Sequence, residues 1–502
     1  MISPGLAIIS SIALPLAGFF AIWLFGRAPN LREAATLATG VALIALTAIV
    51  FSAVGDGARP GFVAITVVGG LAIEFRAEPL GAMFALLASV LWLVNSLYSI
   101  GYMRSHHEKH QTRFYMCFAI AIASAMGVAY AANLFTLFIF YEVLTLSTFP
   151  LVTHNGDAAA RNGGRVYLGL LLGASIAFLL PAIVWVYALA GTTDFTPGGI
   201  LNASVDKAGP VPAILLGLFA FGSAKAALMP LHAWLPGAMV APTPVSAFLH
   251  AVAVVKAGVF AVLKIAVYIF GIDFLAETHA GAPYLWIAAA SILLASAIAM
   301  GKDNLKARLA WSTVSQLSYV TLGAMLATSM GVMGGAMQIA MHAFGKMTLF
   351  MCAGAIYVAA HRTLVSELRG LGRTMPITFI VFFIGAMSIV GLPPLGGSWP
   401  KFFLMLGAAD TGQLAIIAVL IVSSLLNVVY LLSIPAQAFF LEAAPAGQKA
   451  AGAGSWAVDW RNLKEAPLLC LAPPVMTATA AVFLFFLADP LYTYLSPILE
   501  TG

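Results

Sequence analysis

Charged side chains are scarce in this chain. Asp, Glu, Lys and Arg make up only 9% of its 502 residues, while 62% of the residues are hydrophobic. Soluble domains carry about 25% charged residues, so the composition excludes an ordinary soluble protein and predicts a polytopic membrane protein. The net charge of +5 does not indicate nucleic-acid binding, because most basic residues fall in short loops, where membrane orientation explains them.

Cysteines and nucleotide-binding motifs are equally sparse. The three cysteines (Cys117, Cys352 and Cys470) lie apart in apolar stretches and have no metal-ligand spacing, so we expect no metal site. No P-loop and no glycine-rich dinucleotide motif is present, so we expect no cofactor. The first residues lack a basic n-region and are interpreted as the first membrane helix, not as a cleaved signal.

Long hydrophobic runs dominate what is present. A bilayer core requires ~20 apolar residues per helix, and by this measure the sequence predicts about fourteen spans. They lie roughly at 5–25, 34–54, 79–102, 113–131, 133–153, 164–190, 211–239, 244–270, 284–300, 308–328, 331–360, 376–408, 412–441 and 467–488. The spans at 211–239 and 376–408 contain proline-rich breaks.

The basic residues give these spans an orientation. With the N-terminus outside, 16 of the 24 Lys and Arg residues fall in inner loops, and three (Arg59, Arg76 and Lys207) fall in outer loops. The bias agrees with the positive-inside rule. We therefore expect a multi-pass protein of a bacterial or archaeal cytoplasmic membrane, with both termini outside.

The order of the spans predicts an internal duplication. Residues 113–270 and 284–441 each contain five spans, and the fourth span of each set is broken. An odd number of helices per repeat places the two copies in opposite orientations, as in many secondary transporters. The sequence thus predicts an all-α membrane protein with two inverted five-helix repeats. Residues 1–112 form three flanking helices, and residues 442–502 form an inner loop and the last helix.

Three ionisable residues stand out inside the apolar runs. A charge in hydrocarbon costs at least ~3 kcal/mol, so such residues are functional candidates. Glu142 is the acid that lies well inside a span, and Lys225 immediately precedes the first proline-rich break. We expect these two to form a pair that moves protons; a purely structural ion pair or a snorkelling Lys225 are the alternatives. Lys401 follows the second break, where its alternative is a position near the outer surface.

Four more candidates lie on two other helices. His342 and Lys346 are four residues apart and share a helix face, so they can relay protons, although a lone helical His is usually a satisfied core residue. His250 and Lys256 are six residues apart in one predicted helix and face different directions. Lys256 is the stronger candidate of these two.

The sequence alone leaves the roles of the remaining polar residues undecided. His232, within the first break, either lines a path or caps a carbonyl. Ser315 and Gln316 either hold ordered water between lysines or hold helices together. Lys264 lies near the outer end of its span and is predicted to snorkel. Near an inner turn, His106, His107 and His110 accompany Glu108, where we favour a solvated loop over a metal site.

Several sequence motifs resemble one known family. They are KAALMPLHAWLPGAMVAPTPVSAFLHAVAVVKAGVF from Lys225, AWSTVSQLSY from Ala310, MHAFGKMTLF from Met341, ELRGLGRTMP from Glu367, and GLPPLGGSWPK from Gly391. Together they resemble the antiporter-like membrane subunits shared by complex I and the Mrp-type multisubunit cation/proton antiporters. The resemblance extends over nearly the whole chain and is closest to the D subunit of the Mrp-type Na⁺/H⁺ antiporters.

The resemblance implies a fourteen-helix fold with inverted five-helix repeats and roles for particular residues. It implies that Glu142 and Lys225 control a proton path along the membrane midplane. The central residues of that path match Lys256 or His250, then His342 and Lys346, and the terminal residue matches Lys401. A departure is Gly237, where many relatives carry an acidic or polar residue, so any role of that side chain is missing here.

We therefore predict a proton-translocating subunit of a multisubunit Na⁺/H⁺ antiporter. The alternative is a proton-pumping subunit of a complex I-type redox enzyme, a membrane hydrogenase or a bicarbonate-uptake complex; a third reading is a scaffold in which buried charges only fix helix packing. We expect other membrane subunits as partners and no catalytic residue or enzymatic reaction in the chain by itself. The coupling ion, its direction and any sodium route through this chain stay open.

Overall fold

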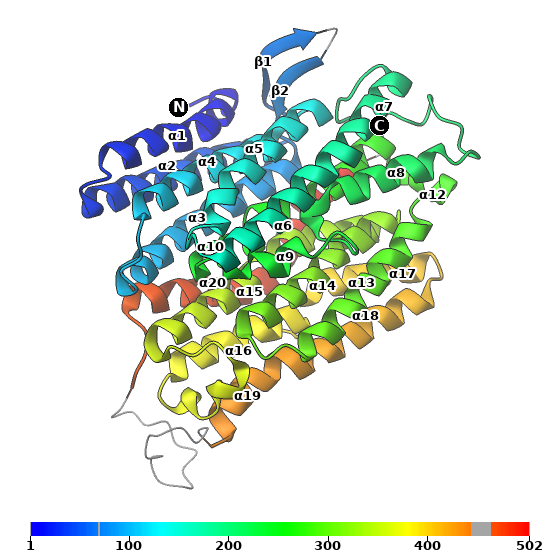
Figure 1. Cartoon of the computed structure of the whole chain (residues 1–502). Helices are drawn as coiled ribbons and strands as arrows, with labels where there is room; N and C mark the ends of the chain where they lie inside the picture. The colour runs from blue at the N-terminus through cyan, green and yellow to red at the C-terminus, as the bar shows by residue number, and fades with distance from the viewer. Residues whose placement is uncertain (1, 69–70, 443–462, 501–502) are drawn as a thin grey trace.

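The structure is a computed structural model that describes residues 2–68, 71–442 and 463–500. Long helices pack side by side, most of them running in similar or opposite directions through the molecule (Figure 1). A helix satisfies its own backbone hydrogen bonds, so it is the form in which apolar chain can cross hydrocarbon. The observed architecture confirms the prediction of a polytopic all-helical membrane protein.

The N-terminal part contains three helices and a hairpin. Their bounds are α1 Pro4–Leu24, α2 Pro29–Gly55, β1 Gly61–Val68, β2 Leu71–Arg76 and α3 Pro79–Ser105. Each of the three helices has a proline at its first position, where the missing N–H costs nothing.

The next part contains the first broken helix. The elements are α4 Gln111–Tyr130, α5 Leu134–Val152, α6 Ala158–Ala174, the π-helical η1 Ser175–Leu179, α7 Leu180–Ala190, α8 Val211–Gly222, η2 Ala224–Ala226, α9 Trp234–Gly237, η3 Ala238–Val240, α10 Thr243–Ala251, α11 Val254–Ile265 and η4 Ala266–Phe270. The segment between α8 and α10 has only short helical turns, as the proline-rich break predicts.

The last part contains the second broken helix. The elements are α12 Ile272–Thr278, α13 Ala282–Met300, α14 Leu305–Met325, α15 Ser329–Ala360, η5 Val365–Leu368, η6 Leu371–Arg373, α16 Pro376–Val390, α17 Ser398–Asp410, α18 Leu414–Asn427, η7 Val428–Leu432, α19 Ser433–Phe440, α20 Leu468–Phe486, α21 Ala488–Leu495 and η8 Ser496–Leu499. The break between α16 and α17 begins at Gly391, whose φ of 88° requires glycine-like freedom.

Each predicted span coincides with helix in the described residues. By length and composition, 11 helical segments of this described part could cross a membrane. The shorter α8 and α16 are the apolar first halves of the broken helices, and the polar α14 is not among the 11. The count of fourteen crossings and the inverted repeats therefore stay predictions.

The hairpin is not predicted by the sequence reading above, which assigns residues 55–78 to an outer loop. β1 and β2 pair antiparallel, with Gly61 opposite Arg76 and Phe62 opposite Phe75. The hairpin projects from one end of the bundle (Figure 1). The sequence does carry a signal for it, since β-branched residues flank a Gly-Gly pair.

Connecting segments gather at two opposite ends of the helices. On the predicted outer side, Phe75 forms a bridge with Ala131, and the Thr196 N–H donates to the Tyr268 carbonyl at 3.2 Å. On the predicted inner side, the Val365 N–H donates to the Asp303 carbonyl at 2.7 Å. The alternation of spans therefore agrees with the contacts, although which end faces the cytoplasm stays a prediction. Most of the inner loop at 442–465, with Lys449 and Arg461, lies outside the described residues.

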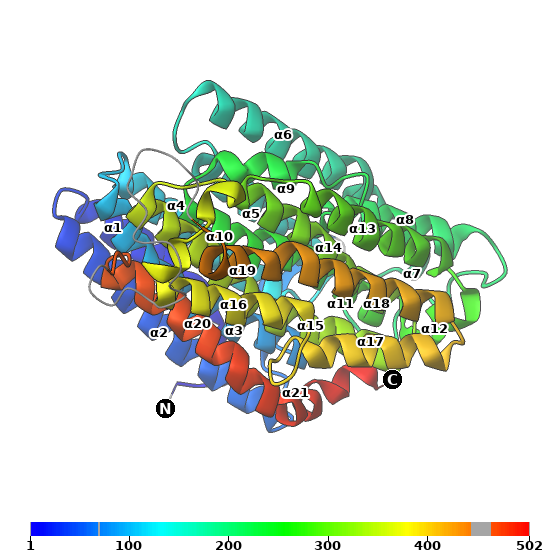
Figure 2. The ribbon, with the colours of Figure 1, turned by 90° about the horizontal axis from the view of Figure 1, so that it is seen from below.

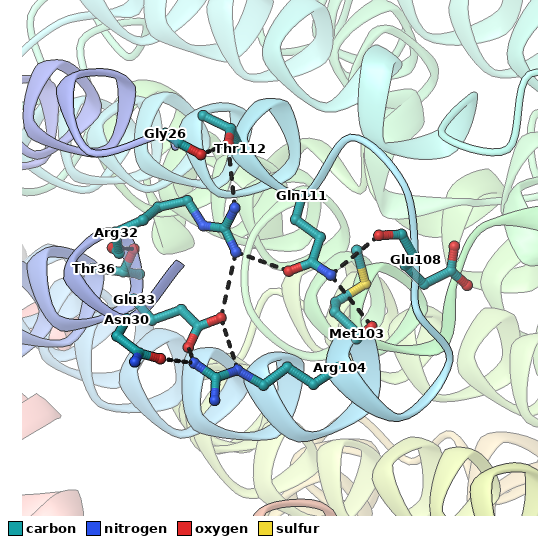
Figure 3. Close-up of polar contacts among 10 residues, drawn as sticks. All are labelled: Gly26, Asn30, Arg32, Glu33, Thr36, Met103, Arg104, Glu108, Gln111 and Thr112. Atoms are coloured by element: carbon teal, nitrogen blue, oxygen red, sulfur yellow. Dashed lines mark hydrogen bonds and ion pairs between the residues drawn. The ribbon is translucent and has the colours of Figure 1, made fainter. Parts of the chain in front are cut away.

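A buried charge cluster joins the flanking helices at this same inner end (Figure 3). Arg32 donates to Gln111 Oε1 at 2.8 Å, and Glu33 pairs with Arg104. Arg32 and Glu33 are each only 4% exposed. The cluster ties the start of α2 to the turn between α3 and α4, so these residues do more than orient the chain in the membrane.

The prediction that Lys264 snorkels is wrong. Lys264 on α11 is fully buried; its Nζ lies 3.0 Å from Glu78 Oε1 and donates to the Ala131 carbonyl at 2.9 Å. Glu78 also accepts from the Tyr268 hydroxyl at 3.0 Å and from the Gly81 N–H at 2.9 Å. The junction between α4 and α5 meets the outer end of α11 at the Ala131 carbonyl, so the ammonium is buried and paired and does not reach the surface itself.

Glu78→Gln should destabilise the fold by about 3 kcal/mol, because it leaves the Lys264 ammonium buried without its carboxylate. The measurement is the thermal melting temperature of the purified assembly in detergent. Glu78→Gln combined with Lys264→Met removes both charges and should melt above Glu78→Gln alone. Equal melting of the single variant and the unmodified protein would contradict the structural role of this pair.

Candidate functional site

The first broken helix holds Lys225 at the point where regular helix ends. α8 stops at Gly222, and the single turn η2 carries Lys225, which is fully buried. Its Nζ donates to the Tyr141 carbonyl at 2.8 Å and lies 3.1 Å from the centre of the Tyr141 ring. The carbonyl and the ring face are both favourable for an ammonium. A position at a membrane surface, the snorkelling alternative, does not agree with this burial.

The structure brings Glu142 next to Lys225, as the sequence predicted. Glu142 Oε1 lies 4.0 Å from Lys225 Nζ, and neither carboxylate oxygen has a hydrogen-bond partner among the described residues. Two unit charges at this distance attract by about 4 kcal/mol at an effective dielectric constant of 20. The two charges are thus close enough to interact electrostatically, yet no hydrogen bond between them fixes the pair in one geometry.

Lys256 meets His342 across two helices. Lys256 is fully buried on α11, and its Nζ lies 2.8 Å from His342 Nδ1 on α15. This is hydrogen-bonding distance, and the tautomer of the imidazole decides which nitrogen donates. His342 Nε2 is buried without a partner among the described residues, so it is available for a further hydrogen bond.

His250 lies on a separate helical segment from Lys256, which corrects the prediction of one continuous helix at 244–270. α10 ends at Ala251 and α11 begins at Val254. The His250 ring packs on Phe350 with centroids 4.6 Å apart, and neither ring nitrogen has a partner among the described residues. His250 and Lys346 lie within electrostatic range of each other.

Lys346 contacts α14 instead of an acid. Its Nζ donates to the Leu309 carbonyl at 3.1 Å and to Ser312 Oγ. Ser315, in contrast, contacts Ser296 Oγ at 2.9 Å on α13, which favours its reading as a helix–helix contact. Gln316 accepts from Gln338 on α15 at 2.9 Å and leaves its own Nε2 unpaired among the described residues.

Lys401 lies inside the protein, so its alternative reading near the surface is not supported. It is 5% exposed; its Nζ donates to the Val390 carbonyl at 2.7 Å and to Ser424 Oγ at 3.0 Å. Val390 is the last residue of α16, whose unpaired carbonyls favour a cation. The ring of Tyr319 lies 5.3 Å away.

His232 is partly exposed in the first break. Its Nδ1 lies 3.2 Å from the Pro230 carbonyl, and its ring lies 5.1 Å from that of Trp311. The contact favours the carbonyl-capping reading, while a place beside the path stays open.

Residues that the sequence analysis did not single out complete these contacts. Tyr141, Gln338 and Ser424 each hold a candidate side chain. Their signal in the sequence is weak, because a Tyr, Gln or Ser in a membrane helix commonly serves packing.

The lysines form a row through the middle of the molecule. α11 contacts α5 and α14, α14 contacts α15, and α15 contacts α17, so the segments that carry Glu142, Lys256, Lys346 and Lys401 lie in sequence across the bundle (Figure 2). His342 is within electrostatic range of Lys256, Lys346 and Lys401. Buried polar atoms without a protein partner are the positions that ordered water occupies in proteins. The arrangement can hold protons on a succession of amines and imidazoles.

No group of three or more His, Cys, Asp or Glu residues in the described parts of the chain could hold a metal ion. The inner turn with His107 and His110 borders a hollow of about 330 Å³ together with His154 and Asn155. Cys352 and Cys470 are buried and Cys117 is partly buried; none forms a disulfide.

Known proteins resemble the chain over the same region. A family model described as NADH:quinone oxidoreductase/Mrp antiporter, TM matches residues 131–427, which include every candidate from Glu142 to Lys401. The chain is 31% identical to NADH-quinone oxidoreductase subunit N of Desulforudis audaxviator over 71% of each protein. It is 26% identical to the Na⁺/H⁺ antiporter D subunit of Alkalihalophilus pseudofirmus over 84% of this chain and 82% of the relative.

The fold also matches a solved structure. A chain of the Mrp complex from Dietzia sp. DQ12-45-1b superposes with a TM-score of 0.82 at 23% identity, over 97% of both chains. The chain spans about half the length of two further relatives, the NAD(P)H-quinone oxidoreductase chain 5 proteins of Picosynechococcus sp. and Synechocystis sp.. The match over residues 131–427 and the relatives at this level of identity show that the chain belongs to the NADH:quinone oxidoreductase/Mrp antiporter family of membrane proteins.

Proposed function

We propose that this chain is the proton-translocating subunit of a multisubunit monovalent-cation/proton antiporter, with Na⁺ as the leading cation. It functions beside other membrane subunits in a cytoplasmic membrane, with both termini outside. The observation that carries the proposal is the buried row from Glu142 and Lys225 through Lys256 and Lys346 to Lys401. A charge in hydrocarbon is costly, and a structural role for one ion pair does not account for three further lysines.

The contacts of the lysines suit proton transfer. Lys346 and Lys401 donate to neutral carbonyl and hydroxyl oxygens. When either ammonium loses its proton, no unpaired carboxylate is therefore left beside the neutral amine. The Lys256–His342 contact at 2.8 Å gives a direct route between two titratable groups. Transfer within such a pair needs a distance of about 2.6–3.2 Å or one bridging water.

The Glu142–Lys225 pair acts as the switch at one end of the row. The separation of 4.0 Å leaves the ammonium free to approach or leave the carboxylate with a small movement of either side chain. Approach favours the charged form of both groups, and separation favours release of the Lys225 proton toward Lys256. Tyr141 retains the amine through its carbonyl in either state.

The second candidate function is proton pumping within a redox complex, which the similarity to NADH-quinone oxidoreductase subunit N favours. The two functions use the same row of lysines and differ in the partner subunits. Purification of the native assembly and its absorption spectrum distinguish them: iron–sulfur or flavin absorption in stoichiometric amount would replace antiport by redox-driven pumping.

Lys225→Met in the complete assembly should lower Na⁺-driven proton flux by at least about a hundredfold, because the row loses its first titratable group. The flux is measured in vesicles with a pH-sensitive dye. Lys302→Met, at an exposed inner position, removes the same charge elsewhere and should leave flux unchanged. Full flux in an assembled Lys225→Met variant would refute the proposal.

Gly258→Ala should also lower the flux, because it displaces Lys225. A Cβ on Gly258 would overlap the Lys225 carbonyl carbon and the Ala226 nitrogen, and it would lie 2.8 Å from Lys225 Cβ. The two closest atoms belong to the backbone, which cannot rotate away as a flexible side chain could. Gly169→Ala on α6 is the matched control, since nothing lies within 4 Å of its Cβ position. Equal flux in the two variants would contradict the close fit at Lys225.

A further inference from the structure

Helix α3 contains buried polar groups that the row of lysines does not explain. α3 carries Trp92, Asn95 and Tyr98, all fully buried. Trp92 Nε1, both amide atoms of Asn95 and the Tyr98 hydroxyl have no hydrogen-bond partner among the described residues. An unpaired buried polar group costs about 1–3 kcal/mol, so a purely structural helix would place apolar side chains here.

These groups continue along one face of α3 toward the inner surface. Asn95, Tyr98, Tyr102 and His106 recur at intervals of three and four residues, which places them on one stripe. Tyr102 meets Thr243, the first residue of α10. His106 is partly exposed and stacks on Tyr357 of α15, with ring centroids 4.9 Å apart. The stripe therefore begins at the inner surface.

α3, α10 and α15 contact one another pairwise and lie side by side (Figure 1). The three helices meet tightly at Gly354 of α15, where a Cβ would collide with the Tyr98 hydroxyl and lie 2.8 Å from Thr243 Cγ2. The polar atoms of Tyr98 and the first turn of α10 thus meet at one level. We refer to this three-helix contact, with Asn95, Tyr98 and Thr243, as the α3 seam.

From this level α10 leads to His250. Thr243, Ser246 and His250 are spaced i, i+3 and i+7, so they share a face, and His250 lies about 10 Å deeper along the helix axis. On α15 the ring of Phe350, which contacts His250, lies between Lys346 and Gly354, four residues from each. His250 is therefore placed between the α3 seam and Lys346.

We propose that the α3 seam is an access path for protons, in which ordered water joins the inner surface at His106 to His250 and, through it, to Lys346 and His342. This inference rests on the proposed function and adds the entrance that the row of lysines requires. The Asn95 amide and the Tyr98 hydroxyl hold the water, and His250, whose two ring nitrogens have no partner among the described residues, passes the proton onward. The path begins on α3, a flanking helix outside both predicted five-helix units, and continues along α10.

The first test removes the polar atoms and retains the shape. In the complete assembly, Asn95→Leu and Tyr98→Phe should each lower cation-driven proton flux about tenfold, while co-purification of the other subunits is unchanged. Tyr130→Phe is the matched control, because Tyr130 is equally buried but ends α4 at the other end of the helices, next to the start of α3. Full flux in assembled Asn95→Leu and Tyr98→Phe would overturn the path, whereas the proposed function would stand if Lys225→Met abolished flux.

The second test does not depend on activity. Cys117, Cys352 and Cys470 are replaced by Ala, and Asn95→Cys is introduced into the full chain. A small membrane-impermeant methanethiosulfonate should modify this cysteine from the side at which His107→Cys is modified, and not from the other. Absence of modification from that side, or modification from the opposite side alone, would overturn the access path even if Asn95→Leu failed to assemble.

Discussion

The cost of burying an ammonium group organises the centre of this protein. Lys225, Lys264, Lys346 and Lys401 lie in the interior, and each donates to a main-chain carbonyl: Tyr141, Ala131, Leu309 and Val390. Lys256 has an imidazole instead. A carbonyl stabilises the ammonium without carrying a full charge, so the amine keeps its position after it loses the proton. Most of these sites thus accommodate two protonation states, which a carboxylate partner at close range would oppose.

Two lysine–glutamate pairs in the same chain differ in how closely the carboxylate is held. Glu78 lies 3.0 Å from Lys264, and its oxygens are filled by backbone and tyrosine donors. Glu142 lies 4.0 Å from Lys225, and its oxygens have no partner among the described residues. The residue types are identical, so sequence alone cannot separate the two geometries. Distance and the saturation of the carboxylate separate them.

The sequence predicted the class of fold and the positions of its helices, because apolar runs and prolines act locally. It also identified Glu142, Lys225 and Lys401 as candidates, since a charged residue inside an apolar run can be recognised without knowing its contacts in the fold. It did not predict the partner of Lys264, which is 186 residues away, or the interruption between Ala251 and Val254, which contains no proline or glycine. It could not show which of Ser312 and Ser315 contacts Lys346. The two serines are less than one helical turn apart, yet Ser312 accepts from Lys346 while Ser315 contacts α13. The roles of the site residues stay predictions.

The short interruption after α10 separates the side chains of His250 and Lys256, whose relative orientation a continuous helix would fix. Val252 and Ala253 lie outside regular helix, so the imidazole of His250 and the amine of Lys256 stand on two helical segments, α10 and α11. The Val252 and Ala253 N–H groups both donate to the Phe248 carbonyl, and the Ala253 carbonyl accepts from the Ala257 N–H. The relative orientation of these two side chains is therefore set by the torsion angles of Val252 and Ala253, and not by the regular turn of one continuous α-helix.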